Sequence, residues 1–183
     1  MRLFLAADLD PKLVIQAGRL VDRAKSALST EAVRWIPETN WHVTLAFLGE
    51  RQESELPGIE EFSGEIVRNF DKAEMQLFRV EPFPQWATAR VLALTVGFAL
   101  PNEMLAFEEA FRKGHRQQNF RPHITVARLR QPGKAQLREI EEKLRSLPGF
   151  PGIYYWPVPS ITLYESILHP EGSQYEALKT WTL

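Results

Sequence analysis

The chain has 183 residues, 44% of them hydrophobic, which is enough for one substantial core, and its lack of cysteine excludes disulfides, thiolate nucleophiles and zinc–thiolate sites. The formal net charge of -1 points to no particular class of partner. The first apolar run meets Asp8 before it reaches signal-peptide length, and no run is as long as a membrane span, so we expect a cytoplasmic protein with no membrane contact and a monomer as the default.

The first half of the chain predicts three strands and two helices from its apolar spacing and its turn residues. The strands are expected over residues 3–7, 33–36 and 41–48. The helices are expected from Pro11, with Leu28 at the end of the apolar face, and over residues 57–70. In the second helix Ile59, Phe62 and Ile66 recur at helical spacing, so we expect all three to face the core.

The second half repeats this mixture of elements. Strands are expected over residues 74–80, 90–96, around His123, 153–156, 161–167 and 177–183. Helices are expected from Pro101 and over residues 134–147. This order favours an α+β fold in which two pseudo-symmetric lobes with antiparallel-rich sheets flank a central cleft. We expect one domain over residues 1–183, with terminal strands exchanged between the lobes.

Two of the four histidines stand in the same tetrapeptide frame, His42-Val43-Thr44-Leu45 and His123-Ile124-Thr125-Val126. Side chains alternate faces along a strand, so the histidine and the threonine of each frame should share one face. Two strands that each offer an imidazole and a hydroxyl to one cleft are suited to metal-free acid–base chemistry on a phosphate. A single histidine in an apolar strand is more often a core residue, so the surroundings of the motifs must decide.

The surroundings of the second motif are basic. From Arg112 to Arg138 the chain contains no Asp or Glu, and His123 lies in the middle of this stretch. Its cations are Arg112, Lys113, Arg116, Arg121, Arg128, Arg130, Lys134 and Arg138. A positive field around the motif would attract an anionic substrate, whereas a basic run taken alone is more often only solvated surface.

Longer segments around both motifs resemble one known family. Residues 40–50, with the sequence NWHVTLAFLGE, and residues 120–128, with the sequence FRPHITVAR, resemble the two motif regions of the RNA 2′,3′-cyclic phosphodiesterases. These enzymes were formerly called 2′–5′ RNA ligases and belong to the 2H phosphoesterase superfamily. Further similarity to the family lies in residues 3–6, residues 161–166, Tyr175 and Trp181. The chain departs from the family at Ala93, where its members often carry Trp.

The resemblance implies the 2H phosphoesterase fold. It also implies hydrolysis of a 2′,3′-cyclic phosphate on RNA or a nucleotide to a 2′-phosphomonoester, without a metal or another cofactor. It assigns His42 as proton donor to the leaving O3′ and His123 as proton acceptor from water. The residues alone leave this direction open, because exchanged roles would produce the same motifs.

Further residues are candidates for substrate contacts. The hydroxyls of Thr44 and Thr125 can donate to the non-bridging phosphate oxygens. Arg128 is the cationic phosphate contact that the resemblance implies, but strict alternation places it on the opposite face from Thr125, so a bulge or the strand end must intervene. Phe47 and Tyr164, inside the matched segments, could stack on a base.

Three other interpretations of the motifs remain open. Ligation of RNA ends through a 2′–5′ bond is the reverse type of reaction and would use the same residues. A non-catalytic module that binds RNA or nucleotides would keep the cleft without turnover. A metallohydrolase is the weakest alternative, because two histidines with no matching carboxylate cluster make a poor divalent-metal site.

Overall fold

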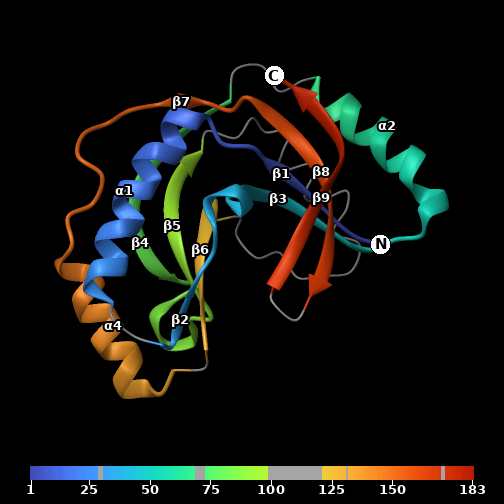
Figure 1. The fold of residues 1–183 in the computed structure, drawn as a ribbon. Helices are drawn as coiled ribbons and strands as arrows, with labels where there is room; N and C mark the ends of the chain where they lie inside the picture. Colours follow the sequence, from blue (N-terminus) through green and yellow to red (C-terminus); the bar gives the residue numbers. More distant parts are fainter. Residues whose placement is uncertain (29–30, 69–72, 99–120, 131, 170–171) are drawn as a thin grey trace.

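The computed structural model describes residues 1–28, 31–68, 73–98, 121–130, 132–169 and 172–183 and has the expected α+β architecture (Figure 1). Its strands are β1 (Arg2–Ala7), β2 (Val33–Trp35), β3 (Val43–Glu50), β4 (Glu74–Phe83), β5 (Val91–Phe98), β6 (His123–Leu129), β7 (Trp156–Pro157), β8 (Ser160–His169) and β9 (Gly172–Thr182). Its α-helices are α1 (Pro11–Ala27), α2 (Leu56–Val67) and α4 (Lys134–Ser146). Short 3-10 helices are η1 (Glu38–Asn40), η2 (Glu53–Glu55) and η3 (Trp86–Thr88). The helix expected from Pro101 lies outside the described residues.

The described strands form one antiparallel sheet with the order β7-β4-β5-β6-β3-β1-β8-β9, and β2 pairs with β6. The N-terminal strand β1 lies between β3 and β8, the first strand of the C-terminal β8–β9 hairpin. In the middle of the sheet, β3 and β6 are joined by the single residue pair Val43–Ile124, which we call the β3–β6 seam. The seam divides the sheet into one half built on β4, β5 and β6 and another built on β3, β1, β8 and β9.

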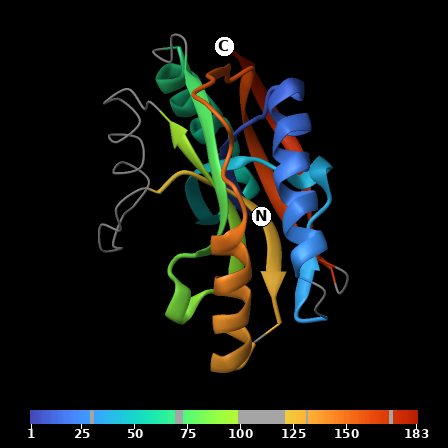
Figure 2. The same ribbon diagram turned by 90° about the vertical axis from the view of Figure 1, so that its left-hand side faces the viewer.

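The helices cover the two halves separately. Helices α1 and α4 lie beside the β4–β5–β6 half, where α1 packs against β4 and α4, whereas α2 contacts β9 (Figures 1 and 2). Helix α1 begins at Pro11 because the Asp10 carboxylate accepts hydrogen bonds from the main-chain N–H of Lys12, at 2.7 Å, and of Leu13, at 3.4 Å. Its buried face is formed by Leu13, Ala17, Gly18, Leu20, Val21 and Ala24, in agreement with the predicted apolar spacing.

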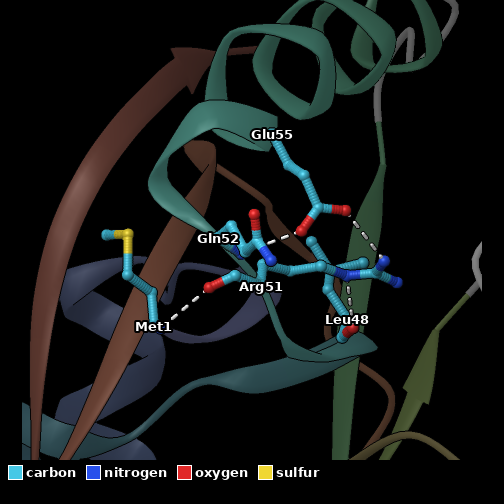
Figure 3. Close-up of polar contacts among 5 residues, drawn as sticks. All are labelled: Met1, Leu48, Arg51, Gln52 and Glu55. Carbon is cyan, nitrogen blue, oxygen red and sulfur yellow. Dashed lines mark hydrogen bonds and ion pairs between the residues drawn. The ribbon is translucent and has the colours of Figure 1, made fainter.

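The connection between β3 and α2 is held by a local network (Figure 3). The Arg51 side chain donates through Nε to the main-chain oxygen of Leu48, at 2.9 Å, and its Nη1 lies 3.4 Å from Glu55 Oε1. The other carboxylate oxygen of Glu55 accepts from the main-chain N–H of Gln52, at 2.8 Å. Main-chain hydrogen bonds between Met1 and Arg51 continue the β1–β3 ladder beyond the strand ends, so the register of β1 is fixed at this end.

Three local predictions were wrong. Phe62 is 38% exposed, whereas Ile59 is buried and Ile66 packs partly buried against the core, as expected; the other buried residues of α2 are Ser63 and Val67. Strand β4 continues through Pro82 to Phe83, although the strand was expected to end at residue 80. The strand expected over residues 153–156 is reduced to β7, and the residues before Trp156 are exposed. None of the described helices is both long and apolar enough to cross a membrane.

Candidate active site

The two His-x-Thr motifs face each other across the β3–β6 seam. Because Val43 pairs with Ile124 in an antiparallel register, each histidine lies opposite the threonine of the other motif. Val43 and Ile124 are both fully buried, so the two histidines and the two threonines project from the other face of the sheet. The register therefore places the four predicted side chains on one face of the sheet, related by an approximate two-fold axis through the seam, and His42, Thr44 and Thr125 line a common cleft.

A β-bulge after each motif turns one more side chain onto this face. The register of β6 against β5 skips Val126, and the register of β3 against β1 skips Leu45. An extra residue reverses the alternation that follows it. Arg128 and Phe47, each five residues after its histidine, consequently share the face of the motifs. The bulge that Arg128 required is thus present, and its equivalent in β3 was not predicted.

The shared face lines a cleft of about 260 Å³. The motif strands contribute His42, Thr44, Phe47, Thr125 and Arg128. The β8–β9 hairpin contributes Ser166, Leu168, Ser173 and Tyr175. Among the described residues, the cations that line the cleft are Arg2 and Arg128, and none of the lining residues is a carboxylate. A cleft of this charge suits an anionic ligand.

The His42 ring is oriented by its main chain and enclosed by aromatic rings. Its Nδ1 donates to the main-chain oxygen of Asn40, at 2.9 Å, because a carbonyl can only accept. This leaves Nε2, 3.2 Å from Thr44 Oγ1, to face the cleft. The ring centroid lies 5.1 Å from that of Phe4 and 5.1 Å from that of Tyr175, which stands perpendicular to it.

The His123 ring is oriented in the same manner. Its Nδ1 donates to the main-chain oxygen of Arg121, at 2.8 Å, again two residues before the histidine. The ring stacks on Phe83, with centroids 3.8 Å apart and an interplanar angle of 22°. The Arg121 guanidinium lies 5.1 Å from the same phenyl ring. Each motif therefore holds its imidazole by a main-chain carbonyl and an aromatic face, with Nε2 left for chemistry.

Burial lowers the pKa of both histidines below the ordinary value of 6.5. The hydrogen bonds to Asn40 and Arg121 oppose this shift. Nearby charges also act on the two rings: Asp8 raises the pKa of His42 and His123 lowers it to a smaller extent, while the Arg121 guanidinium lowers the pKa of His123. The charges around the site thus favour the protonated form at His42 relative to His123.

Asp8 and Tyr164 form a polar cluster behind His42. Asp8 Oδ2 accepts from the hydroxyls of Ser160 and Thr162, both at 2.6 Å, and its Oδ1 accepts from the Tyr164 hydroxyl at 2.8 Å. The Tyr164 ring stacks on Phe4, with centroids 5.3 Å apart. Burial and the Asp8 carboxylate raise the pKa of Tyr164, so its hydroxyl remains a donor at alkaline pH. Tyr164 and His123 are not among the residues that line the cleft.

Several residues of the site gave no signal in the sequence. Asn40 and Arg121 act through their carbonyl groups, which every residue carries. Phe83 meets His123 only because β4, β5 and β6 are neighbours in the sheet. Asp8 was interpreted as the end of an apolar run, but its position after β1 could have indicated a carboxylate at the edge of the site. Within the described chain, no group of three or more His, Cys, Asp or Glu side chains could hold a metal ion.

Comparison with known proteins identifies similar chains of nearly the same length. The sequence model of the LigT-like phosphoesterase family matches residues 8–93 and 102–175. A Thermus thermophilus protein named RNA 2′,3′-cyclic phosphodiesterase is 31% identical over 196 residues, which cover 100% of this chain and 90% of that protein. An Escherichia coli protein of the same name is 29% identical, with 100% and 96% covered.

Solved structures share the fold. A crystal structure of a Thermus thermophilus protein superposes with a TM-score of 0.76 at 26% identity, covering 100% of this chain and 98% of that one. Escherichia coli LigT in complex with 3′-AMP superposes with a TM-score of 0.68 at 26% identity, covering 100% and 97%. The expected α+β architecture is therefore confirmed, both in its elements and in its structural neighbours.

Proposed function

The chain belongs to the LigT-like phosphoesterase family, and on that premise we propose that it hydrolyses 2′,3′-cyclic phosphates of RNA or nucleotides to 2′-phosphomonoesters. The observation that carries the proposal is the arrangement across the β3–β6 seam. There, each of two imidazoles is fixed through Nδ1 to a main-chain carbonyl and lies opposite a threonine hydroxyl. Proteins of this family at 26–31% identity over nearly the whole chain bear the name of this activity, which supports the assignment.

The reaction needs two proton transfers on opposite sides of phosphorus. Nε2 of neutral His123 accepts a proton from water as the water oxygen forms a bond to phosphorus. The bond between phosphorus and O3′ breaks, and Nε2 of protonated His42 donates its proton to O3′. The products are a 2′-phosphomonoester and a 3′-hydroxyl, and proton exchange with solvent restores both imidazoles.

The direction of proton transfer is supported by the charges around each ring. Asp8 favours the protonated form of His42, whereas the positive charge of Arg121 favours the neutral form of His123. A donor must start protonated and an acceptor must start neutral. The proposal therefore keeps His42 as proton donor and His123 as proton acceptor.

The remaining cleft residues are proposed to bind the substrate. Thr44 and Thr125 donate hydrogen bonds to the non-bridging oxygens as negative charge develops there. Arg128 contacts the phosphate, since a guanidinium matches its geometry. Phe47, which is 73% exposed at the cleft, stacks on a base. Tyr164 is proposed to support His42 from behind through Asp8 and Phe4 rather than to contact substrate.

The proposed mechanism uses no metal, because one protonated and one neutral imidazole can carry out both proton transfers themselves. General acid–base catalysis accelerates reactions by about 10² to 10⁴, or about 2.7–5.4 kcal/mol at roughly 1.36 kcal/mol per decade. The loss of either imidazole should therefore slow the reaction by about two decades or more.

The test is turnover of an oligonucleotide that ends in a 2′,3′-cyclic phosphate, with excess EDTA present. Wild type, His42→Ala and His123→Ala are compared, and His169→Ala is the matched control, since His169 is exposed and does not line the cleft. We expect a 2′-phosphate product from wild type and from the control, and a loss of about 10² or more in each motif variant.

Other outcomes would point elsewhere. Loss of wild-type turnover in EDTA, with recovery on adding a divalent metal, would contradict the metal-independent mechanism. A folded wild type that binds the oligonucleotide without converting it would indicate a binding module. Formation of a 2′–5′ joined product when RNA with a 5′-hydroxyl is supplied would identify ligation at the same residues.

A further inference from the structure

A second concave surface lies on the outer side of helix α1. It has a volume of about 630 Å³ and shares no lining residue with the catalytic cleft. One wall is α1, and the other is the segment 150–156, which runs from α4 toward β7 outside α1 and on the opposite side of that helix from the β8–β9 hairpin (Figures 1 and 2). We call this surface the α1 groove. A cavity of this size is large enough for a nucleotide.

The helix wall of the α1 groove is cationic. Lys12, Arg19 and Arg23 project from one exposed stripe of α1, because they are separated by seven and four residues. In the part of the chain that the structure describes, none of the three forms an ion pair, and Arg19 donates only to the neutral Gln16 side chain, at 3.3 Å. None of the residues that line the groove is acidic.

Two cations on the neighbouring helix α4 are neutralised by acidic residues, unlike those of the α1 groove. Lys143 lies 2.6 Å from Glu139, and Arg145 lies 2.6 Å from Glu141. On α1 itself Asp22 stands beside the cationic stripe but lies 3.1 Å from Lys25, outside the groove. The positive charge of the α1 groove is therefore left for an anionic partner.

The opposite wall of the α1 groove is aromatic. The Phe150 ring meets the Tyr154 ring edge-on at 5.8 Å and the Trp156 ring at 5.3 Å. Tyr154 is 59% exposed, so one of its faces is available for stacking. The sequence predicted a strand over residues 153–156, which would have paired their main chain. The segment instead holds three rings against one another beside a row of cations.

We propose that the α1 groove binds single-stranded RNA, with phosphates on Lys12, Arg19 and Arg23 and a base stacked on Tyr154. Cations that follow a backbone and aromatic rings that stack on bases are the two features of sites that bind single strands. The inference rests on the proposed function, which makes RNA the polymer that carries the reactive end. The groove holds a part of the strand away from the catalytic cleft, so long RNAs bind more tightly than short ones.

The first test is direct binding of a fluorescent 12-nucleotide RNA that ends in a 3′-hydroxyl, measured by anisotropy over a range of salt concentrations. Arg19→Ala/Arg23→Ala removes two phosphate contacts, so the slope of log K against log salt should become shallower by about 1.4, at roughly 0.7 per contact. Arg68→Ala/Lys179→Ala is the matched control, because it removes the same charge from exposed positions outside both the groove and the catalytic cleft. It should leave the slope unchanged.

The aromatic wall is tested with Tyr154→Leu, which should weaken binding roughly 5- to 150-fold through the loss of one stacked base. RNA that contains 4-thiouridine should crosslink to the segment 150–156 in wild type. Hydrolysis of a 2′,3′-cyclic mononucleotide should be unchanged in all of these variants, while the KM for a long cyclic-phosphate RNA rises in the groove variants alone.

The inference and the proposed function can fail separately, since the binding assay uses RNA that cannot be hydrolysed. Equal weakening in both double variants would mean that only net charge matters and would overturn the inference. Absence of binding by the wild type would do the same. Concentration-dependent self-association that is lost in Tyr154→Leu, with RNA binding intact, would show that a second copy of the chain occupies the groove instead.

Discussion

Tyr164 and Phe47 were both predicted to stack on a base, but the structure gives them different surroundings, and one pair of substitutions separates their roles. Tyr164→Phe keeps the ring that stacks on Phe4 and removes only the hydroxyl that donates to Asp8 at 2.8 Å. A hydrogen bond to a charged acceptor is worth about 1.5–3 kcal/mol. We take the lower end of this range, about 1.5 kcal/mol, because Tyr164 is half-buried and Asp8 keeps its hydrogen bonds from Ser160 and Thr162.

For a chain of this size each 1 kcal/mol shifts Tm by about 2–4 °C, so Tyr164→Phe should lower Tm by about 3–6 °C. The KM for the cyclic-phosphate RNA should not change. Phe47→Leu should show the reverse pattern, because the ring is 73% exposed at the cleft. There Tm should be unchanged and KM should rise about 5- to 150-fold, the range for one stacked base.

The assays are thermal unfolding followed by circular dichroism and steady-state hydrolysis of the same substrate. Since the pKa of Tyr164 is raised, its hydroxyl remains a donor at alkaline pH, and the loss of Tm should be equal at pH 7 and pH 9. A rise of KM in Tyr164→Phe at unchanged Tm would refute the reasoning and restore Tyr164 as a substrate contact.

Three more predictions follow from particular contacts. Arg128→Ala should lower kcat/KM about 10- to 150-fold, from the roughly 1.5–3 kcal/mol of a charge-assisted hydrogen bond, and Arg128→Lys should recover part of the loss in steady-state assays. Burial lowers the pKa of His123, and only its neutral form accepts a proton, so the acidic limb of the kcat/KM profile should lie below pH 6.5. Phe83→Leu exposes the His123 ring and should move this limb to higher pH in a pH–rate profile. Ser63 is fully buried in α2, and its hydroxyl finds no partner in the described part of the chain. Ser63→Ala should therefore raise the free energy of unfolding, measured by urea denaturation, by up to about 1 kcal/mol, and a decrease would contradict the absence of a partner.

The sequence predicted the elements of the fold best where local rules decide. Helix α1 begins where Asp10 and Pro11 indicate, and its apolar spacing matches its buried face. Predictions from local spacing were wrong where contacts between distant parts of the chain determine burial or pairing. Phe62 has the spacing of a core residue, but α2 is a peripheral helix with few neighbours, and its second face is left exposed. The segment before Trp156 has the composition of a strand, yet only two of its residues reach the edge of the sheet.

For the candidate site, the motifs were visible because repetition and alternation are properties of the sequence itself. The sequence also showed that Arg128 needed a bulge, although not where the bulge lies, since a bulge depends on the register with the neighbouring strand. The supports of the two imidazoles could not be found in this way. Asn40 and Arg121 contribute only carbonyl oxygens, and Phe83 comes from a strand that is forty residues away in the chain.

The near-symmetry of the two motifs has a consequence for how a substrate is oriented. A phosphate turned end for end between the two strands would meet the same imidazole and the same hydroxyl on each side. The four motif side chains therefore cannot tell the 2′ side of a cyclic phosphate from the 3′ side. That choice must come from the pairs of residues that break the symmetry, Phe47 against Arg128 at the bulges and Asp8 against Arg121 behind the rings. Under the proposed mechanism, regioselectivity and catalysis would depend on different residues in and around the cleft.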